Sequence, residues 1–194
     1  FCAPTSMAMT DELANIAETA VSLVSLKRGD IAVDIGANDG TLLRSYRVSG
    51  LERVGFEPAR NLMRFARKGA SRVFNDFFSA APFLKTYGRK RAKVITAIAM
   101  FYDLDDPNSF VGDLARILDP RGIIIIQMNY LVSMLKQNAF DNIGHEHLEY
   151  YSLSSLERLL SRHGLEVFDV ELNDINGEVF ATISGTKTPH REGT

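Results

Sequence analysis

The sequence predicts an α/β fold, in which a mostly parallel, seven-stranded sheet carries helices on both faces and ends in an antiparallel hairpin. Short apolar segments rich in β-branched residues alternate with segments whose apolar residues recur at helical spacing. The first such strand, residues 31–35, runs directly into a glycine-containing loop, residues 36–40. The last two strands are joined through Asn176-Gly177, a strong hairpin signal. We expect this hairpin to add one reversed strand at an edge of the sheet.

Each element has its own local signal. Thr10 is expected to cap the first helix, and a capping box, Ser154-x-x-Glu157, to open the last one at residues 155–163. Pro107 suits the first turn of the helix before the fifth strand. Strands are expected at residues 31–35, 53–58, 71–74, 94–98, 123–128, 166–172 and 179–184, and further helices near residue 41 and at 61–68.

Composition places the chain among globular proteins of one domain. It has 194 residues, 45% of them hydrophobic, and a net charge of −2. A single cysteine, Cys2, cannot form an internal disulfide, which favours a reducing, cytoplasmic setting. The longest apolar run, Ile123 to Leu135, is interrupted by polar residues and is shorter than the roughly 20 residues that cross a bilayer, so no membrane partner is expected. The chain begins without Met or a signal peptide, and we expect a trimmed polypeptide.

The glycine loop and the acid after it predict a ligand site. In a doubly wound sheet, ligands bind at the carboxyl ends of the strands where the strand order reverses, and the first strand-to-helix turn lies there. Glu57 ends the next strand, 21 residues beyond Gly36, where a carboxylate can accept ribose hydroxyls. Asn38 and Thr41 stand where the dinucleotide fingerprint has glycines, so a pyrophosphate cradle is not expected. The alternatives are a simple tight turn and a surface acid before a proline.

The pattern Asp34-x-Gly36-x-x-x-Gly40 resembles the D-x-G-x-x-x-G motif of Rossmann-like S-adenosylmethionine-dependent methyltransferases. The resemblance implies the Rossmann-like methyltransferase fold, which includes such a terminal hairpin, and S-adenosyl-L-methionine as the cofactor. It places Asp34 and Gly36 by the methionine moiety and Glu57 on the ribose. It also implies that Asp76 and Phe77 flank the adenine. The remaining candidate cofactor-binding residues are Ala37, Asn38, Gly40, Pro58 and Ala99.

A histidine-rich stretch, His145-Glu146-His147, lies between the fifth strand and the last helix. A histidine beside a carboxylate can act as a general base near neutral pH, which is what enolising a ketone requires. One alternative is a polar loop with local hydrogen bonds. Another is a metal site, but a third ligand is lacking and the H-E-x-x-H pattern is absent, so no metal is expected.

The run from Asp141 to Leu165 resembles the sugar C-methyltransferases of deoxysugar biosynthesis, through His145-Glu146-His147-Leu148, Tyr151-Ser152-Leu153 and Arg162-His163-Gly164-Leu165. Thr5 to Met9 and Phe56-Glu57-Pro58 are similar to that family too. The resemblance covers roughly residues 5–183, the central domain of the family. It implies methylation of a carbon beside the ketone of a nucleotide-linked 4-keto-6-deoxysugar, with His147 as the base and Glu146 orienting it.

Two positions depart from this family. Gly144 stands where the family has Tyr, and Asp103 stands where it has His; Tyr102 or Tyr150 could supply the missing phenol. The candidate catalytic residues are therefore His147, Glu146, His145 and Asp103. The family's zinc module and its C-terminal domain have no counterpart here, which indicates a fragment or a reduced relative. The expected organisation is an N-terminal segment (1–9), a methyltransferase domain (10–185) and a polar tail (186–194).

Three rival functions stay open. The chain could methylate oxygen or nitrogen of a small molecule, or bind the cofactor without turnover because the flanking domains are missing. An RNA methyltransferase would use the basic run of Lys85, Arg89, Lys90, Arg91 and Lys93. With a net charge of −2 and no basic stripe elsewhere, this run is interpreted as a solvated loop. We therefore expect a small-molecule substrate and no nucleic acid, and the sequence does not indicate an oligomeric state.

Overall fold

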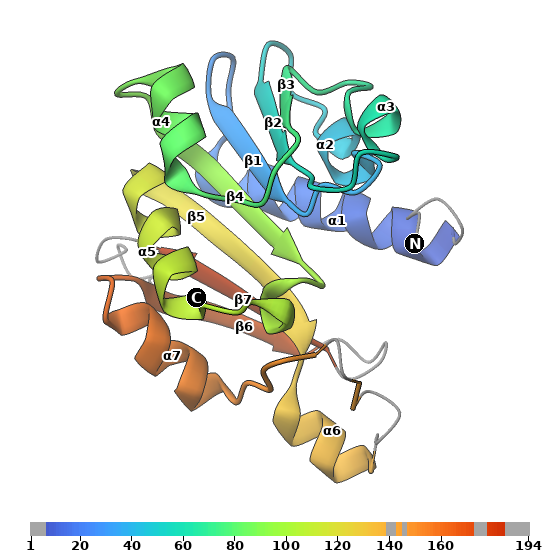
Figure 1. Cartoon of the computed structure of the whole chain (residues 1–194), viewed down its shortest axis with the longest axis vertical. Coiled ribbons are helices and arrows are strands. Elements are labelled where there is room, and N and C mark those ends of the chain that lie inside the picture. The colour runs from blue at the N-terminus through green and yellow to red at the C-terminus, as the bar shows by residue number, and fades with distance from the viewer. Residues whose placement is uncertain (1–6, 139–142, 145–146, 173–177, 185–194) are drawn as a thin grey trace, which may run out of the picture.

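A computed structural model describes residues 7–138, 143–144, 147–172 and 178–184. Its strands form one seven-stranded sheet in the order β3-β2-β1-β4-β5-β7-β6 (Figure 1). The predicted fold class is confirmed. The strands are β1 (Ile31–Ile35), β2 (Glu52–Phe56), β3 (Arg72–Phe74), β4 (Ala92–Ile98), β5 (Leu118–Asn129), β6 (Glu166–Leu172) and β7 (Glu178–Ser184).

The strand order reverses between β1 and β4, which both run parallel to each other and to their outer neighbours. The reversed strand is β7, which pairs antiparallel with both β5 and β6. The expectation that the reversed strand would lie at an edge is wrong, because β7 lies inside the sheet and β6 forms the edge. Charged, exposed residues of β6, Glu166, Asp169 and Glu171, suit an edge that faces water.

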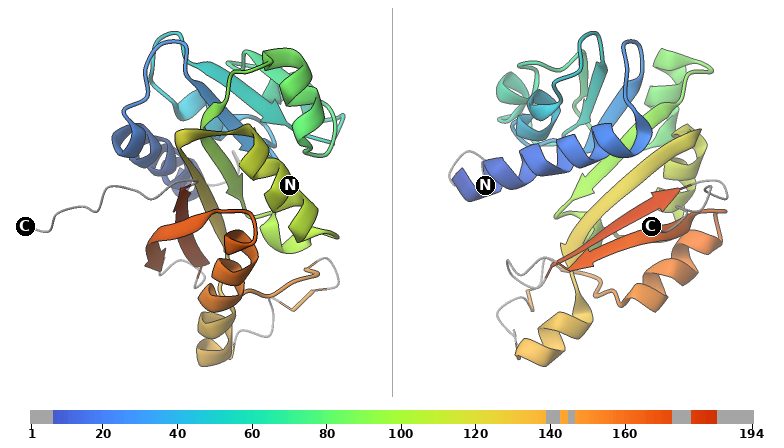
Figure 2. Two further views of the ribbon diagram at one scale, coloured as in Figure 1. Left: turned by 90° about the vertical axis from the view of Figure 1, so that its left-hand side faces the viewer. Right: turned by 180° about the vertical axis from the view of Figure 1, so that it is seen from behind.

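Helices cover both faces of the sheet (Figure 2). One face carries α4 (Ala80–Tyr87), α5 (Pro107–Ile117) and α7 (Leu153–Ser161), and α1 (Met7–Val24) crosses the other. The remaining elements are α2 (Thr41–Ser45), α3 (Met63–Ala66), α6 (Leu131–Gln137) and the 3₁₀ helix η2 (Phe101–Asp103). No helix in the described part of the chain combines the length and the apolar character needed to cross a membrane.

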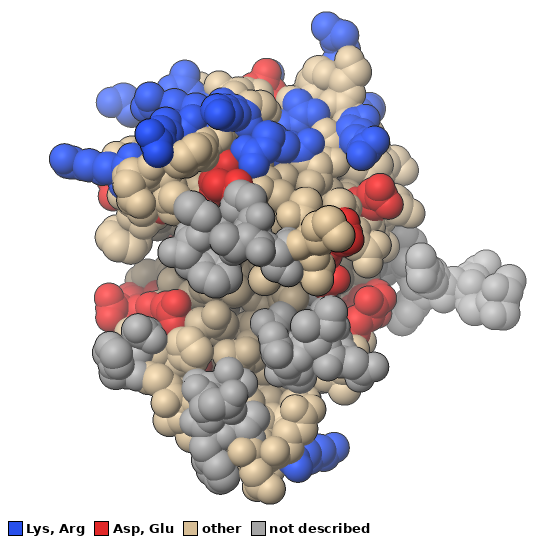
Figure 3. All heavy atoms as spheres, turned by 90° about the vertical axis from the view of Figure 1, so that its right-hand side faces the viewer, with Lys and Arg blue, Asp and Glu red and all other residues tan. Residues whose placement is uncertain are grey.

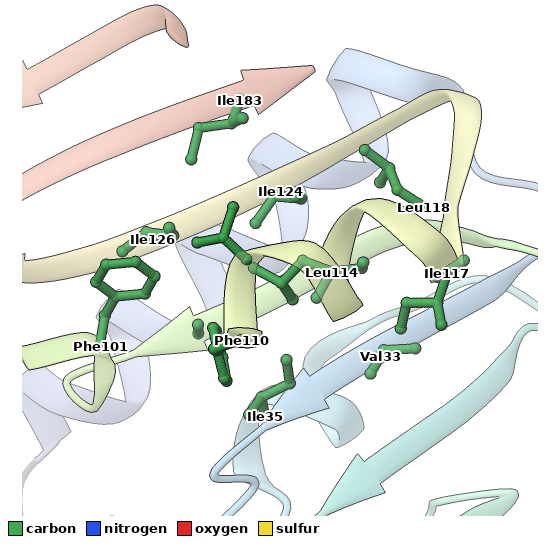
Figure 4. Packing of buried hydrophobic residues seen from close by; sticks show 14 of the residues in the cluster. Val33, Ile35, Phe101, Phe110, Leu114, Ile117, Leu118, Ile124, Ile126 and Ile183 are labelled. Atoms are coloured by element: carbon green, nitrogen blue, oxygen red, sulfur yellow. The ribbon is translucent and has the colours of Figure 1, made fainter. Parts of the chain in front are cut away.

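Alternating residues of the central strands build two apolar layers. Val33, Ile124 and Ile126 pack with α5 residues such as Leu114 and Ile117 (Figure 4). Ala32, Ile123 and Ile125 face the other way, onto Ile16, Ala17 and Ala20 of α1 and onto α2. Burial on both faces explains why β1 and the second half of β5 read as continuous apolar runs.

Several helix boundaries differ from the expected ones. α1 begins at Met7, so Thr10 lies inside it, and α4 and α6 were not predicted. The cap of α7 is Ser152, which forms a reciprocal capping box with Ser155, rather than Ser154 with Glu157. The cause is tertiary: Tyr151 is held in a β-bridge with Tyr130, so the helix starts directly after that anchor.

Basic residues gather at the end of the molecule that carries α3 and α4, which is the upper end in Figure 3. The predicted basic run at residues 85–93 is only part of this region. The turns around α3 add the exposed side chains of Arg60, Arg64, Arg67 and Lys68. Two of these cations, on Arg64 and Lys68, lie over the ring of Phe65.

Candidate active site

The glycine loop is fastened to the end of β2 by main-chain hydrogen bonds. The N–H groups of Gly36 and Ala37 both donate to the carbonyl oxygen of Phe56 over 2.9 Å. The N–H of Asn38 donates to Oε2 of Glu57 over 2.7 Å. The loop after β1 and the acid after β2, which the sequence proposed as parts of one site, are therefore in direct contact.

Gly40 is required at its position. Its φ of +79° is in the left-handed region, and a Cβ there would lie 2.9 Å from the carbonyl oxygen of Ala66. Gly36 also has a positive φ, but a Cβ there would make only ordinary contact with Met100. The close approach at Gly40 brings the start of α2 against α3, and so sets the path of the loop that leads up to it.

Asp34 is a buried carboxyl at the carboxyl end of β1, 4% exposed. The hydroxyl of Thr96, on the neighbouring strand β4, donates to its Oδ1 over 2.7 Å. Burial raises the pKa of Asp34 to about 7, and the charges of Glu57 and Asp39 add to that rise while the Thr96 hydrogen bond opposes it. The side chain is thus poised to lose its proton when a positive charge comes near.

The three carboxyl groups at this edge have unequal partners. Asp39 forms an ion pair with Arg44 at 3.0 Å. Glu57 is 5% exposed and accepts N–H groups from Asn38 and Ala59, each over 2.7 Å. Asp34, by contrast, accepts a hydrogen bond from the hydroxyl of Thr96 and has the acids Glu57 and Asp39 as charged neighbours. A ligand that brings a sulfonium and an ammonium charge fits such an acidic edge.

The residues proposed for the adenine end lie at the surface. Asp76 and Phe77 follow β3 and are exposed, with 77% of Phe77 accessible. Pro58 is exposed after Glu57. Ala99, just beyond β4, has a φ of +52°, a strained value for a residue with a side chain that is typical of functional turns. The structure therefore places the proposed cofactor residues along the ends of β1, β2, β3 and β4.

His147 lies against η2, which directly follows β4. Its ring centroid is 4.5 Å from that of Tyr102 and 6.5 Å from that of Tyr150. The N–H groups of Leu148 and Glu149 both donate to the carbonyl oxygen of Tyr102 over 3.0 Å. These bonds fix the segment that carries His147 at the ligand edge of the sheet, and they bring both phenol candidates beside the histidine.

The structure assigns no catalytic role to the other three proposed catalytic residues, His145, Glu146 and Asp103. His145 and Glu146 lie outside the described residues. Asp103 is exposed and ends η2, where its N–H donates to the carbonyl oxygen of Met100. The assignment of roles to these three residues stays a prediction.

Two residues with clear positions in the site were missed. Thr96 is a polar residue inside an apolar strand, and it pairs directly with Asp34 on the neighbouring strand. An alignment of the two predicted strands could have identified this pair from the sequence. The amide of Asn75 donates to the carbonyl oxygens of Glu57 and Pro58 over 2.8 and 3.0 Å, and so fixes the turn after β2. Asn75 stands beside the predicted Asp76 and carries no separate signal in the sequence.

Comparison with known proteins identifies relatives. The family described as "Methyltransferase domain" matches residues 8–170. The C-methyltransferase NovU of Streptomyces niveus is 33% identical over 163 residues, which are 84% of this chain and 39% of NovU. The chain therefore spans about two fifths of the length of this curated relative.

Solved structures share the fold at low sequence identity. The magnesium protoporphyrin IX methyltransferase of Synechocystis PCC 6803, solved with bound S-adenosylhomocysteine, matches with a TM-score of 0.66 and 10% identity, over 92% of this chain and 87% of that one. An S-adenosylmethionine-dependent methyltransferase of Clostridium acetobutylicum matches with a TM-score of 0.67 and 11% identity, over 90% and 91%. With a family match over most of its length, the chain belongs to the methyltransferase-domain family, and it shares its fold with S-adenosylmethionine-dependent methyltransferases.

Proposed function

We propose that this chain methylates the carbon beside the ketone of a nucleotide-linked 4-keto-6-deoxysugar, with His147 as the base. The observation that carries the proposal is the position of His147, packed on Tyr102 directly beyond β4. Similarity to the C-methyltransferase NovU supports carbon as the acceptor atom. The proposed cofactor residues are those on the acidic edge, Asp34, Glu57 and the glycine loop.

The chemistry follows from these positions. S-adenosyl-L-methionine, when bound, supplies an electrophilic methyl group. His147 would accept the proton from the carbon beside the ketone, and the enolate carbon would then be the nucleophile for the methyl group that the cofactor would supply, with S-adenosylhomocysteine as the product that leaves. Tyr102 or Tyr150 beside the imidazole can donate a hydrogen bond to the oxygen on which negative charge develops. The negative charge of ionised Asp34 would attract the positively charged groups of the cofactor.

The test is proton exchange in D₂O with S-adenosylhomocysteine bound, because this ligand has no methyl group to transfer. A panel of nucleotide-linked 4-keto-6-deoxysugars is incubated with the 194-residue chain, and deuterium uptake is read by mass spectrometry. We expect uptake beside the ketone that falls about 100-fold or more in His147→Ala, the scale of a general base. His163→Ala is the control for the loss of an imidazole, since the His163 ring is bonded to Asn108 on α5 and is not the ring that packs on Tyr102, and uptake should persist at saturating sugar nucleotide.

A different acceptor gives a different result. No uptake with any sugar, while S-adenosylhomocysteine still binds, would move the assignment to methylation of oxygen or nitrogen, or to a core that binds the cofactor without turnover. Uptake that survives in His147→Ala would remove His147 from the mechanism.

A further inference from the structure

A cavity lies beside the proposed catalytic segment, between the start of α5 and the length of α7. Its volume is about 490 Å³, within the range of roughly 300–1,000 Å³ typical of small-molecule sites. Its polar lining consists of Glu149, Tyr151, Ser154, Ser155, Arg158 and Arg162, and Pro107 and Leu159 complete the wall. None of these residues belongs to the cofactor edge described above.

Tyr151 forms part of the cavity wall, but its hydroxyl oxygen is buried from solvent and has no partner among the described residues. The residue is 7% exposed, and its position is firm, because it is held in a β-bridge with Tyr130 and its ring packs 5.3 Å from that of Phe101. Burial, with the charge of Glu149 adding to it, raises the pKa of Tyr151 to about 12, so the hydroxyl keeps its proton at neutral pH.

Two arginines supply positive charge to the same cavity. Arg158 and Arg162 are four residues apart on α7 or just beyond it, so they project from one face of the helix, and both are exposed. Ser154 lies a further four residues back along that face. A guanidinium group binds phosphate oxygens through a two-pronged pair of hydrogen bonds, which makes a pair of arginines a suitable seat for phosphate groups.

The single carboxylate in the lining restricts the ligand further. Glu149 would repel an anion but can accept hydrogen bonds from sugar hydroxyls. The exposed Ser154 contributes a hydroxyl to the same wall, between Glu149 and the arginines in the sequence. The lining thus combines a phosphate-binding side with groups that bind hydroxyls, which matches a phosphorylated sugar or a nucleotide better than an apolar ligand.

The cavity is also close to the proposed base. Glu149 is two residues from His147, and its N–H is bonded to the carbonyl oxygen of Tyr102, whose ring packs on the histidine. We infer that this cavity binds the diphosphate part of the nucleotide-linked acceptor on Arg158 and Arg162. The inference rests on the proposed function for its substrate class, and it names the part of the chain that holds the nucleotide end of that substrate.

The experiment measures binding of uridine diphosphate, uridine and inorganic phosphate to the 194-residue chain by isothermal titration calorimetry. Uridine diphosphate should bind at least about tenfold more tightly than either fragment, and Arg158→Ala/Arg162→Ala should weaken it at least about tenfold. The matched control, Arg64→Ala/Lys68→Ala, removes the same charge at the same spacing from α3 and its flank, and should leave the affinity unchanged.

Affinity for uridine diphosphate that survives the loss of both α7 arginines, or equal affinities for uridine diphosphate and free phosphate, would overturn the inference. Binding of S-adenosylhomocysteine is measured on the same variants. Because the cofactor edge is separate, it should be unaffected, so loss of the diphosphate site is distinguishable from failure of the methyltransferase assignment.

Discussion

Asp34→Asn should make the protein more stable at alkaline pH while it weakens cofactor binding. A carboxyl group whose pKa rises from 3.8 to about 7 on folding destabilises the fold by about 4 kcal/mol once it is ionised in both states. The sign follows from proton binding. The folded state holds the proton more tightly, so this penalty is absent below about pH 4, grows as the pH rises toward 7, and is complete above it. An asparagine carries no such penalty and still accepts the hydrogen bond from Thr96.

The assay is urea denaturation of both proteins at pH 5 and at pH 8. From the same pKa, the stability advantage of Asp34→Asn should be about 2–3 kcal/mol larger at pH 8 than at pH 5. The affinity for S-adenosyl-L-methionine is measured by calorimetry at pH 8. It should fall at least about tenfold in Asp34→Asn, because the variant lacks the negative charge that attracts the ligand's positive groups. The wild-type affinity should rise with pH through 7, and that of the variant should not.

The control is Asp39→Asn, a few residues away in the same loop. Asp39 is ion-paired with Arg44 and accepts from Thr41, so this change should destabilise the protein at both pH values. If the Asp34 variant shows the same stability difference at pH 5 and pH 8, burial does not hold the Asp34 proton, and the account of the acidic edge is refuted.

Two further changes test the geometry of the loop. Gly40→Ala should cost about 2 kcal/mol or more in unfolding free energy, because its Cβ would press on the Ala66 carbonyl at a positive φ. Gly164→Ala, also at positive φ but with open space around it, should cost only about 1 kcal/mol, and equal costs would contradict the packing argument. Glu57→Gln should lower the affinity for S-adenosyl-L-methionine at least about tenfold by calorimetry, since an amide cannot accept from both the Asn38 N–H and a ligand hydroxyl as a carboxylate does. Unchanged affinity would remove Glu57 from the cofactor residues.

Local patterns in the sequence determined the elements of this protein and the residues that flank its cofactor edge. Alternation of apolar strands and helices, the loop from Gly36 to Gly40, and the Asn-Gly turn are all short-range signals, and the strands and the hairpin follow from them. Glu57 was found because it lies at a fixed distance from the glycine loop along the chain. Such signals survive folding because they depend on backbone conformation and hydrophobic spacing alone.

Tertiary structure decided which distant groups meet. Thr96 reaches Asp34 from 62 residues away only because β1 and β4 pair in that register. The start of α7 was misplaced by the sequence because the bridge from Tyr151 to Tyr130, not the serine pattern, fixes where the helix begins. The same anchor places Tyr151 in the wall of a cavity that two arginines also line. A pattern in one segment cannot specify such contacts, because their energy comes from packing between segments that the sequence separates.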